Sequence, residues 1–101
     1  MSTFGKEDKL IETGVGETFS IELESNPTTG YQWQEKIDRG KVELIDRQFE
    51  LPSNAFGAAG KEVLTFKSLS EGDSVIQLDY RCPWEDDTAE TIKIKLSSQK
   101  K

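Results

Sequence analysis

The sequence predicts an all-β sandwich, and two observations support this fold class. Apolar residues alternate with polar residues at period two in three separate runs, each typical of a strand with one face in a core and the other in water. Clusters of Gly, Pro, Asn and Asp separate the apolar runs at short intervals, and no segment shows a convincing helical period. Short strands with turn signals at this spacing are typical of a sandwich.

The strands are expected where residues alternate or where shorter apolar runs occur. In chain order they lie near residues 10–11, 19–24, 31–37, 42–51, 63–66, 76–81 and 92–97. The segment 42–51 is apolar but irregular, which indicates a strand with a bulge or two short strands. Trp33 lies in a strand pattern, and we expect it to be the buried Trp of the sandwich. The sequence at residues 71–73 predicts an ordinary turn between strands.

The composition of the chain argues against several classes of function. The chain has 101 residues, enough for a single domain (1–101) with a modest core. Its formal net charge of −6 argues against a nucleic-acid partner, which needs clustered Lys and Arg. The chain contains no His and no Gly-rich phosphate loop, and the acidic residues 85–87 match no calcium-loop spacing. We expect no catalytic residues, no metal and no cofactor.

The N-terminal residues and the cysteine usage indicate a cellular location. Residues 1–9 contain no apolar signal-peptide core, and no stretch is long enough to span a bilayer. Cys82 is the one cysteine, which excludes an internal disulfide framework. Both features predict a cytoplasmic protein without a membrane partner, although a mature chain that has lost a signal peptide would look the same.

The first of three unusual connections runs from Asn26 to Tyr31. Pro27 fixes its own φ and favours an extended Asn26, and Gly30 can take a positive φ to turn the chain into the next strand. Such a loop is organised before it meets a partner, which reduces the cost of ordering on binding. The alternative is a well-made turn with no further role.

The second connection covers residues 52–60 and consists mainly of small residues. Small side chains leave the backbone open to another chain, and Phe56 is an apolar residue at a position expected to be exposed. The alternative is a loose connector in which Phe56 folds back onto the core.

The third connection covers residues 81–87. Trp84 follows Pro83 and precedes three acidic residues, which is a poor position for a core side chain. We therefore expect an exposed Trp84 that anchors a partner, because exposed Trp often does so. The alternative is a Trp that caps the end of the sandwich.

In order and content, these three connections resemble the chagasin family of cysteine-peptidase inhibitors. The family has an Asn-Pro-x-Thr-Gly-aromatic loop, a Gly-x-Gly-Gly loop and an Arg-Pro-aromatic loop. The first motif is intact here, Ala59 replaces a Gly in the second, and Cys82 occupies the Arg position of the third, with Arg81 one residue early. The resemblance spans most of the chain.

The resemblance implies an immunoglobulin-like β-sandwich whose three inhibitory loops sit side by side at one end. Together they form a wedge that fills the cleft of papain-like cysteine peptidases, reversibly and in competition with substrate. The tip of the first loop lies over the catalytic centre, the second loop runs along one side, and Trp84 packs on the other. The implied contact residues are Asn26, Pro27, Thr28, Thr29, Gly30, Tyr31, Phe56, Gly57, Ala58, Ala59, Gly60, Arg81, Cys82, Pro83 and Trp84.

The sequence also leads to two expectations for the unbound protein, on its oligomeric state and on its thiol. We expect a monomer before it meets a peptidase. We also expect Cys82 to be a free thiol without a role in inhibition, because its acidic neighbours disfavour the thiolate.

Other classes of function remain open at this point. A carbohydrate-binding module would use Tyr31, Trp33 and Trp84 as an aromatic platform, although it would not need Pro27 or the small-residue loop. A structural module of an adhesion assembly is a third possibility.

Overall fold

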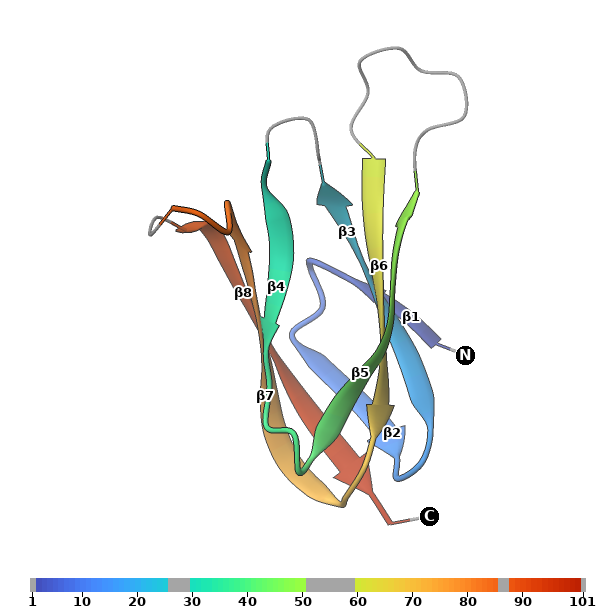
Figure 1. The fold of residues 1–101 in the computed structure, drawn as a ribbon. Coiled ribbons are helices and arrows are strands. Elements are labelled where there is room, and N and C mark those ends of the chain that lie inside the picture. The colour runs from blue at the N-terminus through green and yellow to red at the C-terminus, as the bar shows by residue number, and fades with distance from the viewer. Residues whose placement is uncertain (1, 26–29, 51–59, 86–87, 101) are drawn as a thin grey trace.

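The computed structural model describes residues 2–25, 30–50, 60–85 and 88–100 as two four-stranded sheets packed face to face (Figure 1). In chain order the strands are β1 (Ser2–Gly5), β2 (Leu10–Gly14), β3 (Thr18–Ser25), β4 (Gln32–Lys36), β5 (Val42–Glu50), β6 (Gly60–Ser68), β7 (Gly72–Arg81) and β8 (Thr88–Gln99). One sheet has the order β1-β3-β6-β5 and the other β2-β8-β7-β4. The predicted all-β sandwich is confirmed, and the described residues contain no helix that could traverse a lipid bilayer.

The core lies between the sheets and uses the alternating positions. Inward-facing apolar residues come from both sheets and are buried: Phe19, Ile21, Leu23, Leu64, Phe66, Ile76, Leu78, Ile92, Ile94 and Leu96. Trp33 belongs to the same cluster and is 2% exposed, so its predicted place in the core is confirmed. Burial of these side chains is the main term that stabilises the sandwich.

A bulge in β5 determines which of its side chains face inward. Leu44 pairs with Phe66 and Asp46 with Thr65, so Ile45 is the extra residue. The predicted irregularity of this segment is therefore a bulge within one strand. Beyond the bulge, Arg47 pairs with Leu64, which puts Arg47 on the inward side of an edge strand.

Strand β1 is not among the strands that the sequence predicts. This strand pairs in parallel with β3, and Phe4 lies edge-on to Phe19 with ring centroids 6.3 Å apart. A strand of four residues with one apolar side chain has no alternation to detect, because its pairing depends on a distant strand. The predicted edge strand near Leu10 is confirmed as β2, at the edge of the second sheet.

Three connections join strands at one end of the molecule, which we call the loop-bearing end. There β3, β5 and β7 end and β4, β6 and β8 begin (Figure 1). The register agrees, because Ser25 pairs with Gly60 and Arg81 pairs with both Gln32 and Thr88. The strands therefore bring the three unusual connections to the same end of the sandwich.

Candidate functional site

Gly30 is where the first and third connections meet. Its φ is 83°, so the predicted positive φ is confirmed. A Cβ atom at this position would lie 2.8 Å from Cη2 of Trp84 and 3.3 Å from Sγ of Cys82. A side chain here would therefore be strained by the backbone and would also push against the Trp84 indole. Two motifs about fifty residues apart in sequence are in direct contact at Gly30.

The exit of the first connection is fixed by aromatic contacts. Tyr31 is half-buried, and its ring centroid lies 5.4 Å from that of Tyr80. Tyr80 also contacts Trp33, with centroids 4.9 Å apart. Aromatic contacts of this kind add to the stabilisation from area burial. They link the loop-bearing end to the top of the core.

Burial of Trp33 removes one alternative. The indole N–H of Trp33 donates to the backbone oxygen of Glu24 at 3.0 Å, and the ring is in the core. The alternative of a carbohydrate-binding module with Tyr31, Trp33 and Trp84 as an exposed platform is therefore wrong. A buried indole cannot stack on a sugar ring. The strand alternation gave Trp33 its inward position.

The backbone of Trp33 is also bonded, to residues that the sequence analysis did not select. Its amide donates to Oε2 of Glu62 at 3.0 Å, and its carbonyl accepts from Nη1 of Arg47. Arg47 pairs with both Glu62 and Glu35. One signal was available, since Glu62 is in phase with Leu64 and Phe66 and so falls on the inward face of β6.

The third connection contains a tight turn. The amide of Glu85 donates to the backbone oxygen of Cys82 at 3.0 Å, with Pro83 at the position that favours such a turn. Arg81 donates from Nη2 to the backbone oxygen of Glu85 at 2.6 Å. The predicted loop start is one residue early, because Arg81 is the last residue of β7 and bonds the turn from the strand.

Trp84 is the most exposed large apolar residue described, with 74% of its surface accessible. The predicted exposure is confirmed, and capping of the sandwich is not its role. Its indole rests against Gly30 while most of the ring faces solvent. A large apolar side chain held in this way on a tight turn is a typical anchor for a partner.

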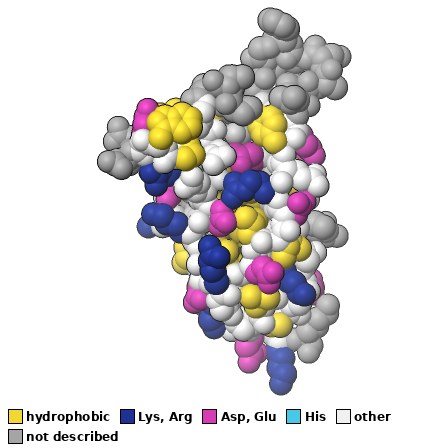
Figure 2. Space-filling view, viewed as in Figure 1, with side chains coloured by type: hydrophobic (Ala, Val, Ile, Leu, Met, Phe, Trp, Pro, Cys, Tyr) yellow, Lys and Arg dark blue, Asp and Glu magenta, His cyan; other side chains and the backbone are white. Residues whose placement is uncertain are grey.

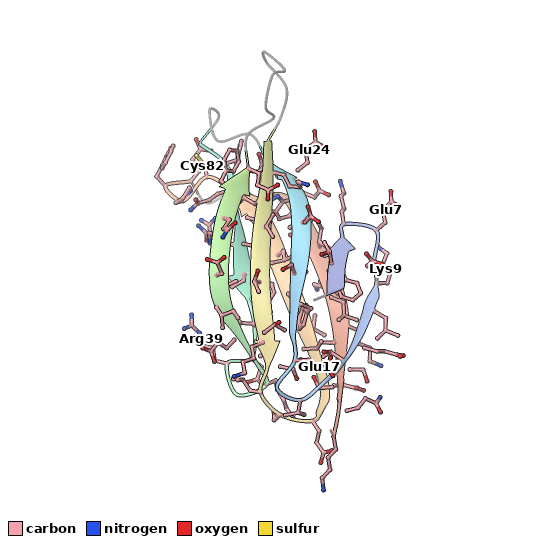
Figure 3. All side chains as sticks on the ribbon, turned by 90° about the vertical axis from the view of Figure 1, so that its right-hand side faces the viewer. Glu7, Lys9, Glu17, Glu24, Arg39 and Cys82 are labelled. Atoms are coloured by element: carbon pink, nitrogen blue, oxygen red, sulfur yellow. The ribbon has the colours of Figure 1, made fainter. Side chains whose placement is uncertain are left out.

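Cys82 differs from Trp84 although the two are separated by one residue. Its side chain is a free thiol with 3% exposure, near the top of the sandwich in Figure 3. Burial raises the pKa of the Cys82 thiol, the charge of Glu85 raises it further, and a backbone hydrogen bond from Trp84 partly offsets both. The expected disfavoured thiolate is confirmed in direction, with burial as the larger cause. The thiol has little surface to offer a partner.

The second connection is described only at its borders. Gly60 was predicted as the last residue of the loop but is the first residue of β6 and is buried. A Cβ atom on Gly60 would lie 2.5 Å from Cζ of Phe49 and 2.7 Å from the backbone oxygen of Glu50, so close packing explains the glycine. Eight predicted contact residues lie outside the described residues: Asn26, Pro27, Thr28, Thr29, Phe56, Gly57, Ala58 and Ala59.

A groove of about 480 Å³ lies between the third connection and the end of β5. Its lining includes three aromatic side chains, Tyr31, Phe49 and Trp84, and two charged ones, Arg47 and Glu62. Figure 2 shows hydrophobic side chains exposed at the loop-bearing end, above a band of acidic and basic side chains over β4 and β5. Four of the predicted contact residues thus line a mixed apolar and polar groove: Gly30, Tyr31, Pro83 and Trp84.

Comparison with known proteins gives one matching family. The model of the chagasin family peptidase inhibitor I42 matches residues 12–97, which is most of the chain. Chagasin from Trypanosoma cruzi is 30% identical over 80 residues, or 73% of each chain. Amoebiasin-2 from Entamoeba histolytica is 29% identical over 84 residues, which cover 79% of this chain and 68% of the relative.

The fold has solved counterparts. The crystal structure of a cysteine protease inhibitor from Entamoeba histolytica superposes with a TM-score of 0.82, covering 98% of this chain and 97% of that one. Its sequence identity is 22%, so this likeness concerns the fold alone. Together with the family match, it covers nearly the whole sandwich.

Proposed function

The chain belongs to the chagasin family of peptidase inhibitors, and from this premise we propose that its loop-bearing end occupies the active-site cleft of its target. The protein is an inhibitor of papain-like cysteine peptidases and is not an enzyme.

The contact between Gly30 and Trp84 is the single observation that carries the proposal. It joins the first and third connections into one surface and holds the most exposed large apolar side chain described at its rim. Organisation before binding reduces the entropy lost on docking, and a buried Trp anchor supplies a large share of interface energy. Both properties suit a wedge that enters a cleft.

Each connection has a proposed position in the cleft. Thr28, Thr29 and Gly30 lie over the catalytic centre, flanked by Asn26, Pro27 and Tyr31. Residues 56–59 run along one side through their backbone, and Gly60 supports them from β6. Pro83 and Trp84 pack on the other side, with Arg81 and Cys82 holding their turn. The resemblance of the three motifs and the shared end of the strands support these assignments.

Inhibition is reversible and competitive. A covalent step would need a reactive group at the loop-bearing end, and the one thiol is buried with a raised pKa. A rigid surface that fills the cleft excludes substrate without offering a bond to cleave. The inhibitor therefore leaves the complex intact.

Titration of papain with the purified protein tests this function. We expect activity to fall linearly to zero at one inhibitor per active site and to return on dilution, with the inhibitor's mass unchanged. Serine peptidases and metallopeptidases should keep full activity. Absence of inhibition, a cleaved inhibitor or a permanent adduct would each contradict the proposal.

We also propose that the protein works in a reducing compartment such as the cytoplasm. Its one cysteine is a free thiol, which a reducing compartment preserves. Fractionation of cells with an antibody against the protein should recover it with cytosolic markers. Recovery from the medium would contradict this location.

A further inference from the structure

Trp33 joins the two sheets through its backbone and its ring. It lies on β4, an edge strand, so among the described strands only β7 pairs with its backbone, on one side. Side chains of the other sheet occupy the opposite side, because Glu62 on β6 accepts from the Trp33 amide and Arg47 on β5 donates to its carbonyl. The indole N–H bonds β3 through Glu24. Three strands of one sheet therefore bond a single residue of the other.

Arg47, Glu62 and Glu35 form a charged cluster beside Trp33, in which two carboxylates share one guanidinium. Glu62 is 4% exposed, and a buried carboxylate is unfavourable unless it is paired and hydrogen-bonded. Its partner Arg47 lies 3.2 Å away and also reaches Glu35 on β4. The planar guanidinium can bond several acceptors in fixed directions, which a lysine ammonium cannot do. Arg47 thus ties β4 to β5 and β6 at once.

The cluster lies close to two of the three connections. Trp33 is three residues beyond Gly30, at the exit of the first connection. Arg47 and Glu62 lie on the two strands that border the second connection, on opposite sides of residues 51–59. Both side chains line the groove beside Trp84 and Tyr31. A shift of β4 against β5 and β6 would therefore move the first connection relative to the second.

We propose that Arg47 and Glu62 are positioning residues that hold the first inhibitory loop in register with the second. They act through the backbone of Trp33 and set the strength of inhibition without carrying the main peptidase contacts. This inference rests on the proposed function of the loop-bearing end. A purely stabilising role would lower the melting temperature of a variant and leave its inhibition constant unchanged as long as the variant stays folded.

The double variant R47M/E62L tests this role. Methionine and leucine keep much of the side-chain volume but leave the buried Trp33 amide and carbonyl without partners, so the melting temperature should fall by several degrees while the variant stays folded at the assay temperature. Inhibition of papain should weaken by about tenfold, because the first loop loses its fixed position. In the free protein, the Trp33 amide should exchange with deuterium much faster once its acceptor is gone.

The matched control is K61M/E22L. Lys61 precedes Glu62 on β6 and pairs with Glu22 at 2.6 Å and with Glu50 at 3.7 Å. This variant therefore removes ion pairs near the same end that do not involve β4. Inhibition and Trp33 amide exchange should both match the parent. Equal losses in the two double variants would overturn the positioning role, because any lost ion pair would then have the same effect.

The outcomes separate the two proposals. If the parent protein does not inhibit papain, the proposed function fails, while amide exchange still tests the bonds to Trp33. If the parent inhibits and R47M/E62L inhibits equally well, the positioning role is wrong.

Should R47M/E62L fail to fold, the variant Arg47→Lys tests the role instead. This variant keeps the ion pair with Glu62, and we expect a melting temperature like that of the parent with several-fold weaker inhibition. Unchanged inhibition by Arg47→Lys would overturn the inference.

Discussion

The closed end, formed by residues 15–17, 37–41 and 69–71, binds its own backbone, whereas the loop-bearing end presents Trp84 to solvent. At the closed end the Gly16 amide donates to Ser68 and the Leu69 amide to Lys41, each at 2.8 Å. Figure 3 shows the labelled Cys82 and Glu24 near the loop-bearing end, and Glu17 and Arg39 toward the other. Short turns that satisfy their own polar groups have a structural role. The exposed Trp84 at the other end is the side chain that we propose for binding a partner.

The two tryptophans differ in the same way as the two ends, and truncation of Trp33 should have the largest effect on stability. Trp33→Ala should reduce the free energy of unfolding by about 3–5 kcal/mol, because it empties core volume and removes the bond to Glu24. Chemical denaturation measures this loss. A Trp33→Ala variant that keeps its stability and loses only inhibition would reverse the assignment of the two residues.

Trp84→Ala should have the opposite profile. Interface anchors of this kind cost about 2 kcal/mol or more when truncated, which is roughly a thirtyfold loss of affinity. The melting temperature should barely change, because the ring is 74% exposed in the free protein. Inhibition constants against papain, measured with thermal melts on the same samples, test both statements. An early melt with parent-like inhibition would place Trp84 among the structural residues.

Gly30 at the loop-bearing end and Gly72 at the closed end both have a positive φ, so the same substitution can be made at each. Gly30→Ala should cost about 1–3 kcal/mol of stability through its φ of 83° and should also displace Trp84, so inhibition weakens several-fold. Gly72→Ala at the closed end has a φ of 114° and should lose stability without losing inhibition. Denaturation curves and inhibition constants of both variants provide the measurement. Equal loss of inhibition in both variants would remove the distinction between the ends.

A pH-dependent effect is expected on the outer face of the second sheet. Burial alone would raise the pKa of Asp79, but hydrogen bonds from Gln77, Thr91 and Lys36 outweigh it and hold that pKa below its ordinary value. Ionised Asp79 therefore stabilises the fold above about pH 4, and this contribution is lost as pH falls through the folded-state pKa. Asp79→Asn should be less stable than the parent at pH 7, with a gap that narrows by pH 3. A gap that does not change with pH would contradict this explanation.

The smallest expected effect concerns the thiol of Cys82. Its burial and raised pKa predict slow reaction with a thiol reagent in the native protein at pH 7, and fast reaction once the chain is unfolded. The rate of colour release from an aromatic disulfide reagent, with and without denaturant, measures this. A native rate close to the unfolded rate would mean that the third connection opens readily.

Local patterns in the sequence predicted much of this fold. Alternation located the strands and separated Trp33 from Trp84, and the Pro-Gly spacing predicted the positive φ of Gly30. These features depend on residues close together in the chain. β1 and the pairing of Arg47 with Glu62 depend instead on register between distant strands and on the bulge at Ile45.

Loop boundaries show the same limit at the candidate site. Gly60 and Arg81 look like loop residues in the sequence, yet both lie in strands. Gly60 is needed because Phe49 and Glu50 of the neighbouring strand approach closely, which only the folded register reveals. The motifs therefore predicted which residues gather at one end of the sandwich, and the register determined which of them lie in strands.

Hydrogen–deuterium exchange of the protein with and without papain tests the role of the loop-bearing end most directly. We expect papain to slow exchange at residues 26–31, 52–60 and 81–87, while the turns of the closed end and the outer strands keep their free rates. Trp84→Ala should weaken this protection without moving it. Protection centred on the closed end or on the outer face of either sheet, with the three connections unchanged, would contradict the account.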